Sequence, residues 1–195
     1  VRSTGFYQTK AKNLIGMANL PTQGYDIVYN AAKNGRVENC KLLKATIGIQ
    51  AQSNCDSIVV VNNDIGGTSA DTTTYVQNIG ISMLSTMNYT VSGNRVVGIH
   101  RSSTSYVTGV LIGWQGGTFV SPEPGVISGN TIRDVRMTGF NAAAYAAYGI
   151  YLGSNSATSN VLVLNNMISN IFSESDGSTT GVDYTPHGII VIQGG

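Results

Sequence analysis

The sequence predicts an all-β protein built as a solenoid, and three observations indicate this. Asparagine recurs in one local setting: a β-branched residue, two further residues, Asn, one residue and a second β-branched residue. A glycine that opens a short apolar run recurs before most of these asparagines. The apolar runs are rich in Val and Ile and are bounded by Gly, Asn and Ser, which is typical of strands. A repeat of a few tens of residues with two fixed landmarks indicates stacked structural units.

The asparagine pattern is complete four times and degenerate twice, with spacings of 26, 24, 31, 36 and 36 residues. Asn tolerates the left-handed conformations of tight turns, and its amide can bond to the next copy when repeats stack. We therefore expect a structural ladder of asparagines, preceded by a degenerate copy at Asn13. The expected ladder consists of Asn39, Asn63, Asn94, Asn130 and Asn166.

The glycine landmark predicts the first strand of each repeat, with spacings of 24, 32, 29, 40 and 39 residues. In the last complete repeat, residues 161–164 are expected to form a second strand, 165–166 a tight turn and 167–171 a third strand. Residues 188–192 would begin the next repeat. The apolar runs open at Gly24, Gly48, Gly80, Gly109, Gly149 and Gly188.

This pattern resembles the right-handed parallel β-helix of the pectin-lyase-like superfamily, in which Asn stacks at the turn between the second and third strands of each coil. The resemblance covers roughly residues 24–195 and implies about six coils with long inter-strand loops. Residues 1–23 are expected to be an N-terminal junction or a degenerate first coil. Residues 24–195 are expected to be a parallel β-helix and a fragment of a longer protein. The resemblance is specific for the fold and nearly silent on chemistry.

Composition favours a secreted or cell-surface protein. Charged residues make up 11% of the chain, against roughly 25% in an average soluble protein. The chain lacks a run of 18 apolar residues, so we expect no transmembrane segment. Residues 1–44 have a net charge of +5 and residues 45–195 a net charge of −4. The cations are too scattered to predict a nucleic-acid face.

The resemblance implies that any catalytic residues would project outward from the first strands. Strand alternation after the landmark glycine makes Asp26 the only carboxylate in that outward set. Glycoside hydrolysis normally needs two carboxylates about 5–9.5 Å apart, so an enzyme is not the preferred prediction. Asp26, Asp183 and His187 remain weak catalytic candidates, while His100 and Arg101 close one third strand. The sequence contains no motif for a metal or a cofactor, and we expect neither.

The C-terminal half of the outward set is apolar. Leu111, Tyr151 and Ile190 would form an exposed stripe with Trp114 nearby, unless the long loops cover it. Such stripes mark contact surfaces, and aromatic side chains suit sugar rings, so these four residues are candidate binding residues. Cys40 and Cys55 could form one disulfide in a secreted chain or remain free thiols.

The preferred function is a structural or binding module, adhesin-like or part of an appendage, within a larger assembly. Two alternatives stay open: a polysaccharide lyase or glycoside hydrolase, and a segment of a viral or phage fibre. Residues 188–192 start a coil without completing it, and open strand edges invite pairing. We therefore expect another chain, or further residues of the same chain, to stack on this end. A polysaccharide is a further candidate partner.

Overall fold

The computed structural model describes residues 24–67, 74–102, 106–113, 124–138, 146–154, 160–174 and 185–193, together with three short strands within residues 2–17. Over these residues the protein is all-β, its strands pair in parallel, and helices are absent. The described part of the chain therefore offers no helix that could cross a membrane. Asn13, Trp114 and Asp183 lie outside the described residues.

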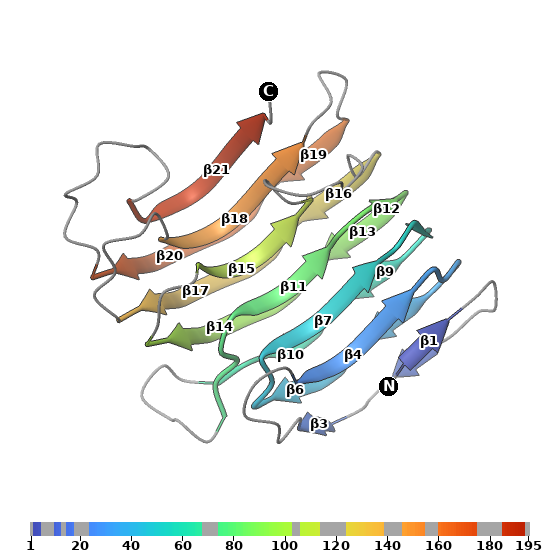
Figure 1. Ribbon diagram of the computed structural model, residues 1–195, viewed down its shortest axis with the longest axis horizontal. Helices are drawn as coiled ribbons and strands as arrows, with labels where there is room; N and C mark the ends of the chain where they lie inside the picture. The colour runs from blue at the N-terminus through green and yellow to red at the C-terminus, as the bar shows by residue number, and fades with distance from the viewer. Residues whose placement is uncertain are drawn as a thin grey trace.

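Nineteen strands form three parallel sheets (Figure 1). Sheet 1 has the order β1 (Arg2–Thr4), β4 (Tyr25–Asn30), β7 (Ile47–Gln52), β11 (Ile79–Met83), β15 (Val107–Ile112), β18 (Ala147–Ser154), β21 (His187–Gln193). Sheet 2 has the order β2 (Lys10–Lys12), β5 (Arg36–Glu38), β9 (Val59–Val61), β13 (Tyr89–Ser92), β16 (Gly125–Ser128), β19 (Val161–Leu164). Sheet 3 has the order β3 (Ile15–Met17), β6 (Lys41–Leu43), β10 (Asp64–Ile65), β14 (Arg95–Arg101), β17 (Thr131–Met137), β20 (Met167–Ser173). A separate pair joins β8 (Cys55–Asp56) and β12 (Thr86–Met87).

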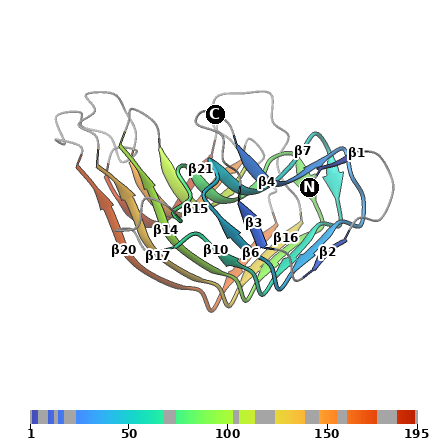
Figure 2. The same cartoon turned by 90° about the horizontal axis from the view of Figure 1, so that it is seen from below.

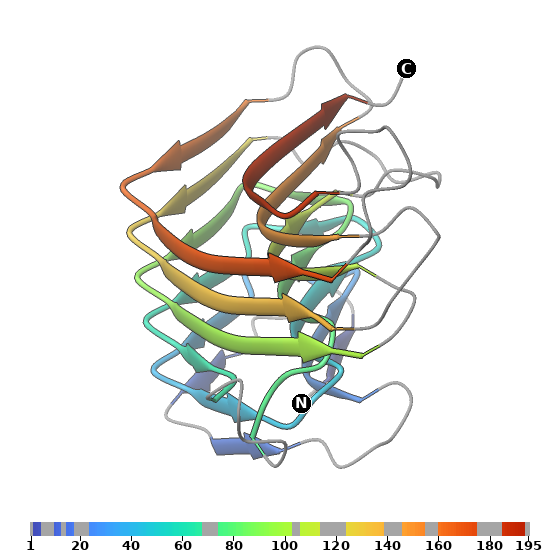
Figure 3. The ribbon, with the colours of Figure 1, turned by 90° about the vertical axis from the view of Figure 1, so that its left-hand side faces the viewer.

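The chain visits sheets 1, 2 and 3 in turn and then returns to sheet 1, and we call one such passage a circuit. Each strand pairs with the equivalent strand of the neighbouring circuit, as Figure 3 shows for the stacked strands. Strand β19 has the predicted bounds, β20 extends two residues beyond the predicted third strand, and β21 includes the predicted residues 188–192.

Sheets 2 and 3 meet at a sharp corner that repeats along the stack (Figure 2). One residue at each corner has a left-handed backbone, with φ between 52° and 62°. Asn and Gly occupy every one of these positions because they tolerate this conformation best. The left-handed corner residues are Asn39, Asn62, Gly93, Gly129 and Asn165.

Directly after this corner residue comes a row of asparagines that are hydrogen-bonded between circuits. Asn63 Nδ2 donates to Asn94 Oδ1 at 2.9 Å, Asn94 Nδ2 to Asn130 Oδ1 at 3.0 Å, and Asn130 Nδ2 to Asn166 Oδ1 at 2.8 Å. Each of the four amides also donates to a backbone carbonyl of the preceding circuit. We call Asn63, Asn94, Asn130 and Asn166 the asparagine row.

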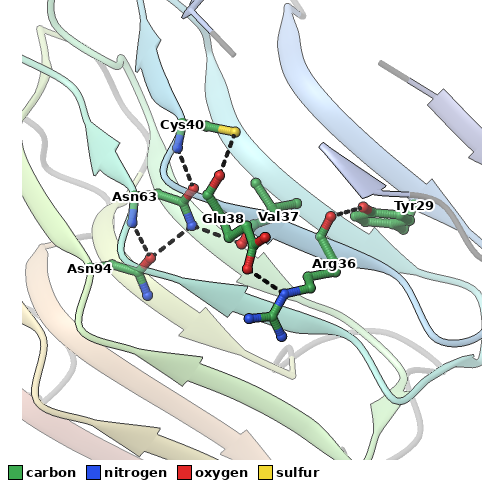
Figure 4. A network of polar contacts seen from close by, with 7 residues as sticks. All are labelled: Tyr29, Arg36, Val37, Glu38, Cys40, Asn63 and Asn94. Carbon is green, nitrogen blue, oxygen red and sulfur yellow. Dashed lines mark hydrogen bonds and ion pairs between the residues drawn. The ribbon is translucent and has the colours of Figure 1, made fainter. Parts of the chain in front are cut away.

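The prediction for Asn39 is wrong by one position. Cys40 occupies the equivalent place in its circuit, because the Cys40 backbone N–H donates to Asn63 Oδ1 at 3.0 Å (Figure 4). Asn39 is the exposed left-handed corner residue instead. The pattern misplaced it because Asn is suited to both positions: its backbone tolerates the corner and its amide suits the row.

The core lies between the three sheets and consists mainly of Val and Ile. One inward column of sheet 1 contains Gly48, Gly80, Gly109, Gly149 and Gly188, whose backbones approach sheet 3 closely. Asp26 shares this column, because its neighbours Tyr25 and Ile27 pair with Ile47 and Ile49. The prediction that Asp26 faces outward is therefore wrong, and Val28 occupies that outward position beside Gln50.

Both cysteines are buried free thiols. Cys55 Sγ donates to the carbonyl of Gln52 at 3.0 Å, and Cys40 Sγ to that of Glu38 at 3.3 Å. Burial raises the pKa of the Cys55 thiol, so this group stays protonated and packs as a small apolar side chain.

Candidate interaction surface

The outward face of sheet 1 carries a second hydrophobic cluster, separate from the core between the sheets. Leu111, Tyr151 and Ile190 align in one column of this face, as the sequence predicted. They are only 1%, 8% and 7% exposed, so the prediction of an exposed apolar stripe is wrong. Their side chains pack among Ile79, Tyr148 and other apolar residues of the same face. These three residues are therefore not available as a contact surface.

The two weak catalytic candidates that lie within the described residues do not converge. Asp26 lies on β4 and His187 on β21, five strands apart in sheet 1, which corresponds to about 24 Å. The Asp26 side chain is buried in the glycine column. His187 stacks on Tyr148 with ring centroids 6.1 Å apart, and its Nε2 lies 3.0 Å from Thr185 Oγ1. Across the described residues, no group of three His, Cys, Asp or Glu side chains could hold a metal ion.

A different surface stands out at the C-terminal end of the three sheets. The described part of the chain has seven exposed large hydrophobic residues, and six of them lie on β19, β20 and β21. Phe172, one of the six, packs under the Arg136 guanidinium at 5.9 Å from its ring centroid. We call the other five the C-terminal apolar surface. They are Leu162, Leu164, Met167, Ile189 and Val191.

Two residues of this surface are the last members of core columns. Ile189 pairs with the buried Ile150, and Val191 pairs with Leu152, which packs against the core. Ile189 and Val191 are 48% and 72% exposed, whereas earlier members of their columns, such as Ile81 and Met83, are fully buried. Among the described residues, no strand covers the core at this end, so Ile189 and Val191 lose part of the stabilisation that burial gives to earlier members of their columns.

The other three residues face outward, and two of them replace polar side chains of the preceding circuit. Leu164 follows Ser128, whereas Leu162 follows the apolar Val126. Met167 follows Thr131, which itself pairs with Arg95. The last circuit is therefore apolar on its outer side as well as at its open end.

Strands β19, β20 and β21 stand last in the order of their sheets, and their sequences contain no Lys, Arg, Asp or Glu. Edge strands of soluble proteins are usually protected by charged side chains, because open ladders template pairing with other chains. At the opposite end, the sequences of β1 and β2 contain Arg2, Lys10 and Lys12. The two ends of the stack thus differ in chemistry.

Sequence reasoning found the unfinished strand at residues 188–192 but missed the outward Leu162, Leu164 and Met167. A signal was present for Leu164 and Met167, which replace Ser128 and Thr131 of the preceding repeat. It becomes readable only when the strands are aligned in register.

No protein-family model matches the chain, and no curated protein matches it. Among solved structures, the chain is similar to the Streptococcus pneumoniae surface protein and adhesin PfbA. The identity is 11% and the TM-score 0.33, with 85% of this chain and 66% of that chain covered. A likeness of this strength says nothing about function.

Proposed function

We propose that the chain is a right-handed parallel β-helix that serves as a structural and binding module of a secreted or cell-surface assembly. The circuit through three parallel sheets supports the β-helix, and the low charge of the chain supports the extracellular setting. The module joins its assembly by strand addition to β19, β20 and β21. This role does not require chemistry at Asp26, Asp183 or His187.

One observation carries the proposal: exposed large hydrophobics gather on three uncharged strands that end their sheets. A contact that covers Ile189 and Val191 completes two core columns. The same contact pairs the open N–H and C=O groups of the three strands. Backbone pairing and apolar burial therefore favour the same occupant, which is a polypeptide that supplies strands.

The occupant that fits this surface is a second copy of the chain, meeting the first at the same end around a twofold axis. In such an isologous contact, one surface meets itself, so apolar side chains face apolar side chains. A head-to-tail contact would instead place the cationic sequences of β1 and β2 against the apolar end, which is not a complementary match. We therefore propose a symmetric end-to-end dimer.

Sedimentation velocity over a range of protein concentrations tests this proposal. We expect the wild-type chain to form a dimer. We expect Val191→Lys to raise the dimer dissociation constant at least tenfold. Met87→Lys is the matched control, because Met87 is the one exposed large hydrophobic of the described residues that lies outside the last circuit. A wild-type monomer at 100 µM (about 0.1 mM, weaker than most specific complexes), or equal effects of the two substitutions, would overturn the proposal.

A further inference from the structure

A row of aromatic and cationic side chains crosses the outward face of sheet 3 and ends at Phe172 on the edge strand β20. His100 on β14 pairs in register with Arg136 on β17, which pairs with Phe172 on β20. Tyr75 lies outside the strands, next to Val76, which bridges to Ile99, and its ring contacts the His100 imidazole. His100, Arg136 and Phe172 are about 4.8 Å apart along the stack because they come from neighbouring strands.

The contacts within the row leave two nitrogen atoms without a partner. His100 Nε2 lies 2.8 Å from Thr138 Oγ1, and the Tyr75 ring meets the imidazole edge-on with centroids 5.5 Å apart. The Phe172 ring covers one side of the Arg136 guanidinium. His100 Nδ1 and Arg136 Nε are both buried atoms without a hydrogen-bond partner. Burying a polar atom without a hydrogen-bond partner is unfavourable, and more so when the group is charged.

Arg136 differs from the other arginines of this face. Arg95 is paired with Asp64, and Arg133 lies 3.8 Å from Asp134. Among the described residues, no carboxylate is paired with Arg136. Arg136 therefore provides a positive charge that forms no ion pair with a carboxylate of the described residues, and it lies beside an imidazole; both side chains are partly accessible to solvent.

We propose that Arg136 and His100 form an oxyanion-binding site, which takes the carboxylate, sulfate or phosphate group of a ligand. A guanidinium presents a planar set of donors that matches the geometry of such groups. The His100 imidazole beside it adds a second positive charge when the ring is protonated. Phe172 and Tyr75 flank the two groups, so the site also offers apolar ring surface to the part of the ligand that carries the anion.

The electrostatics of His100 provide a readout. Burial, and then the positive charge of Arg136, hold the pKa of His100 below its ordinary value, while Glu174 acts in the opposite direction. A bound anion would counteract the positive charge of Arg136 and so raise the pKa of His100. Binding should therefore strengthen as the pH falls through the pKa of His100. The charged or titratable groups facing this imidazole are Tyr75, Arg136 and Glu174.

The test is an NMR titration of the two histidine rings with sodium sulfate, sodium phosphate and sodium acetate, at constant ionic strength maintained with chloride. We expect at least one of these oxyanions to raise the pKa of His100 by about one unit, as an opposite charge at short range does. His187, which lies in sheet 1, is the internal control and should not respond. The three anions separate sulfate, phosphate and carboxylate as the preferred group.

Arg136→Gln should raise the pKa of His100 without added anion and abolish its response to the anion. Arg133→Gln is the matched control on the same strand, because Arg133 faces outward beside Asp134 and should leave the response unchanged. The proposal is overturned if none of the anions shifts His100, if His187 responds equally, or if Arg136→Gln retains the response. Each readout is independent of dimerisation, since the Val191→Lys variant can be titrated in the same way.

Discussion

The side-chain amide of Asn94 links three circuits of the chain at once. Its Nδ2 donates to Asn130 Oδ1 at 3.0 Å and to the Val60 carbonyl at 2.9 Å, while its Oδ1 accepts from the side chain of Asn63. It also accepts from the Asn63 backbone N–H at 3.0 Å. An apolar side chain of similar size would satisfy none of these partners.

Asn94→Leu should therefore lower the free energy of unfolding by about 1–3 kcal/mol or more, because several buried polar groups lose their partners. Asn160→Leu is the control, since Asn160 is exposed and lies outside the asparagine row, and its cost should be about 0.5 kcal/mol or less. Urea denaturation followed by circular dichroism measures both values. Equal losses at the two positions would show that the row does not stabilise the fold.

The glycine column offers a matched pair of positions. A Cβ atom at Gly149 would lie 2.4 Å from the Gly188 carbonyl oxygen and 2.6 Å from Ile168 Cγ2. A Cβ atom at Gly188 would lie 3.8 Å from Ile168 Cγ2, which is ordinary contact. Gly149→Ala should cost about 1–3 kcal/mol through overpacking, whereas Gly188→Ala should be nearly neutral in the monomer. Thermal unfolding of dilute protein compares the two, and similar melting temperatures would contradict this explanation.

Gly188→Ala should nevertheless weaken association. Gly188 lies on β21, where the proposed dimer adds a strand of the second copy, and an added Cβ atom there would crowd the backbone of that strand. We expect an increase in the dimer dissociation constant without a change in monomer stability. Sedimentation velocity measures the dissociation constant, and thermal unfolding of dilute protein measures the stability of the monomer. An unchanged dissociation constant would argue against pairing at this edge.

Tyr29 should make the fold sensitive to alkaline pH. Its ring is fully buried, its hydroxyl donates to the Arg36 carbonyl at 3.0 Å, and burial raises its pKa from 10.0 to about 12. Because the folded pKa is the higher one, the stabilisation is fully present below about pH 10 and is lost as the pH rises toward 12. Tyr29→Phe removes this titration, so the stability of the variant should fall less steeply than that of the wild type between about pH 10 and pH 12. Parallel slopes for variant and wild type in pH-dependent urea denaturation would refute the assignment.

The sequence predicted the strands best where two landmarks occur together. Residues 161–164 and 188–192 lie between Asn and Gly signals and form β19 and most of β21. Register was harder to predict where one residue type fits two places. Gly24 precedes β4 just as a landmark glycine would, so alternation predicted that Asp26 faces outward. In the structure, Asp26 occupies the glycine column instead, and Val28 occupies the outward position.

The candidate surface could be predicted only in part. Alternation correctly aligned Leu111, Tyr151 and Ile190, but a column pattern does not reveal whether other parts of the chain bury the side chains. The exposure of Val191 and Ile189 follows from their place in the last strand of sheet 1. The His100–Arg136 pair depends on strand register across 36 residues, which local sequence does not specify.

The central claim, that β21 accepts a further strand, is tested most directly by hydrogen exchange of the backbone amides of His187–Gln193. Exchange should be measured at two protein concentrations, one well below and one well above the dimer dissociation constant. The account predicts slower exchange of β21 at the higher concentration and no change in β11, which has a paired strand on each side within sheet 1. Equal exchange of the β21 amides at both concentrations, in samples that sedimentation shows to be monomeric and dimeric, would contradict it.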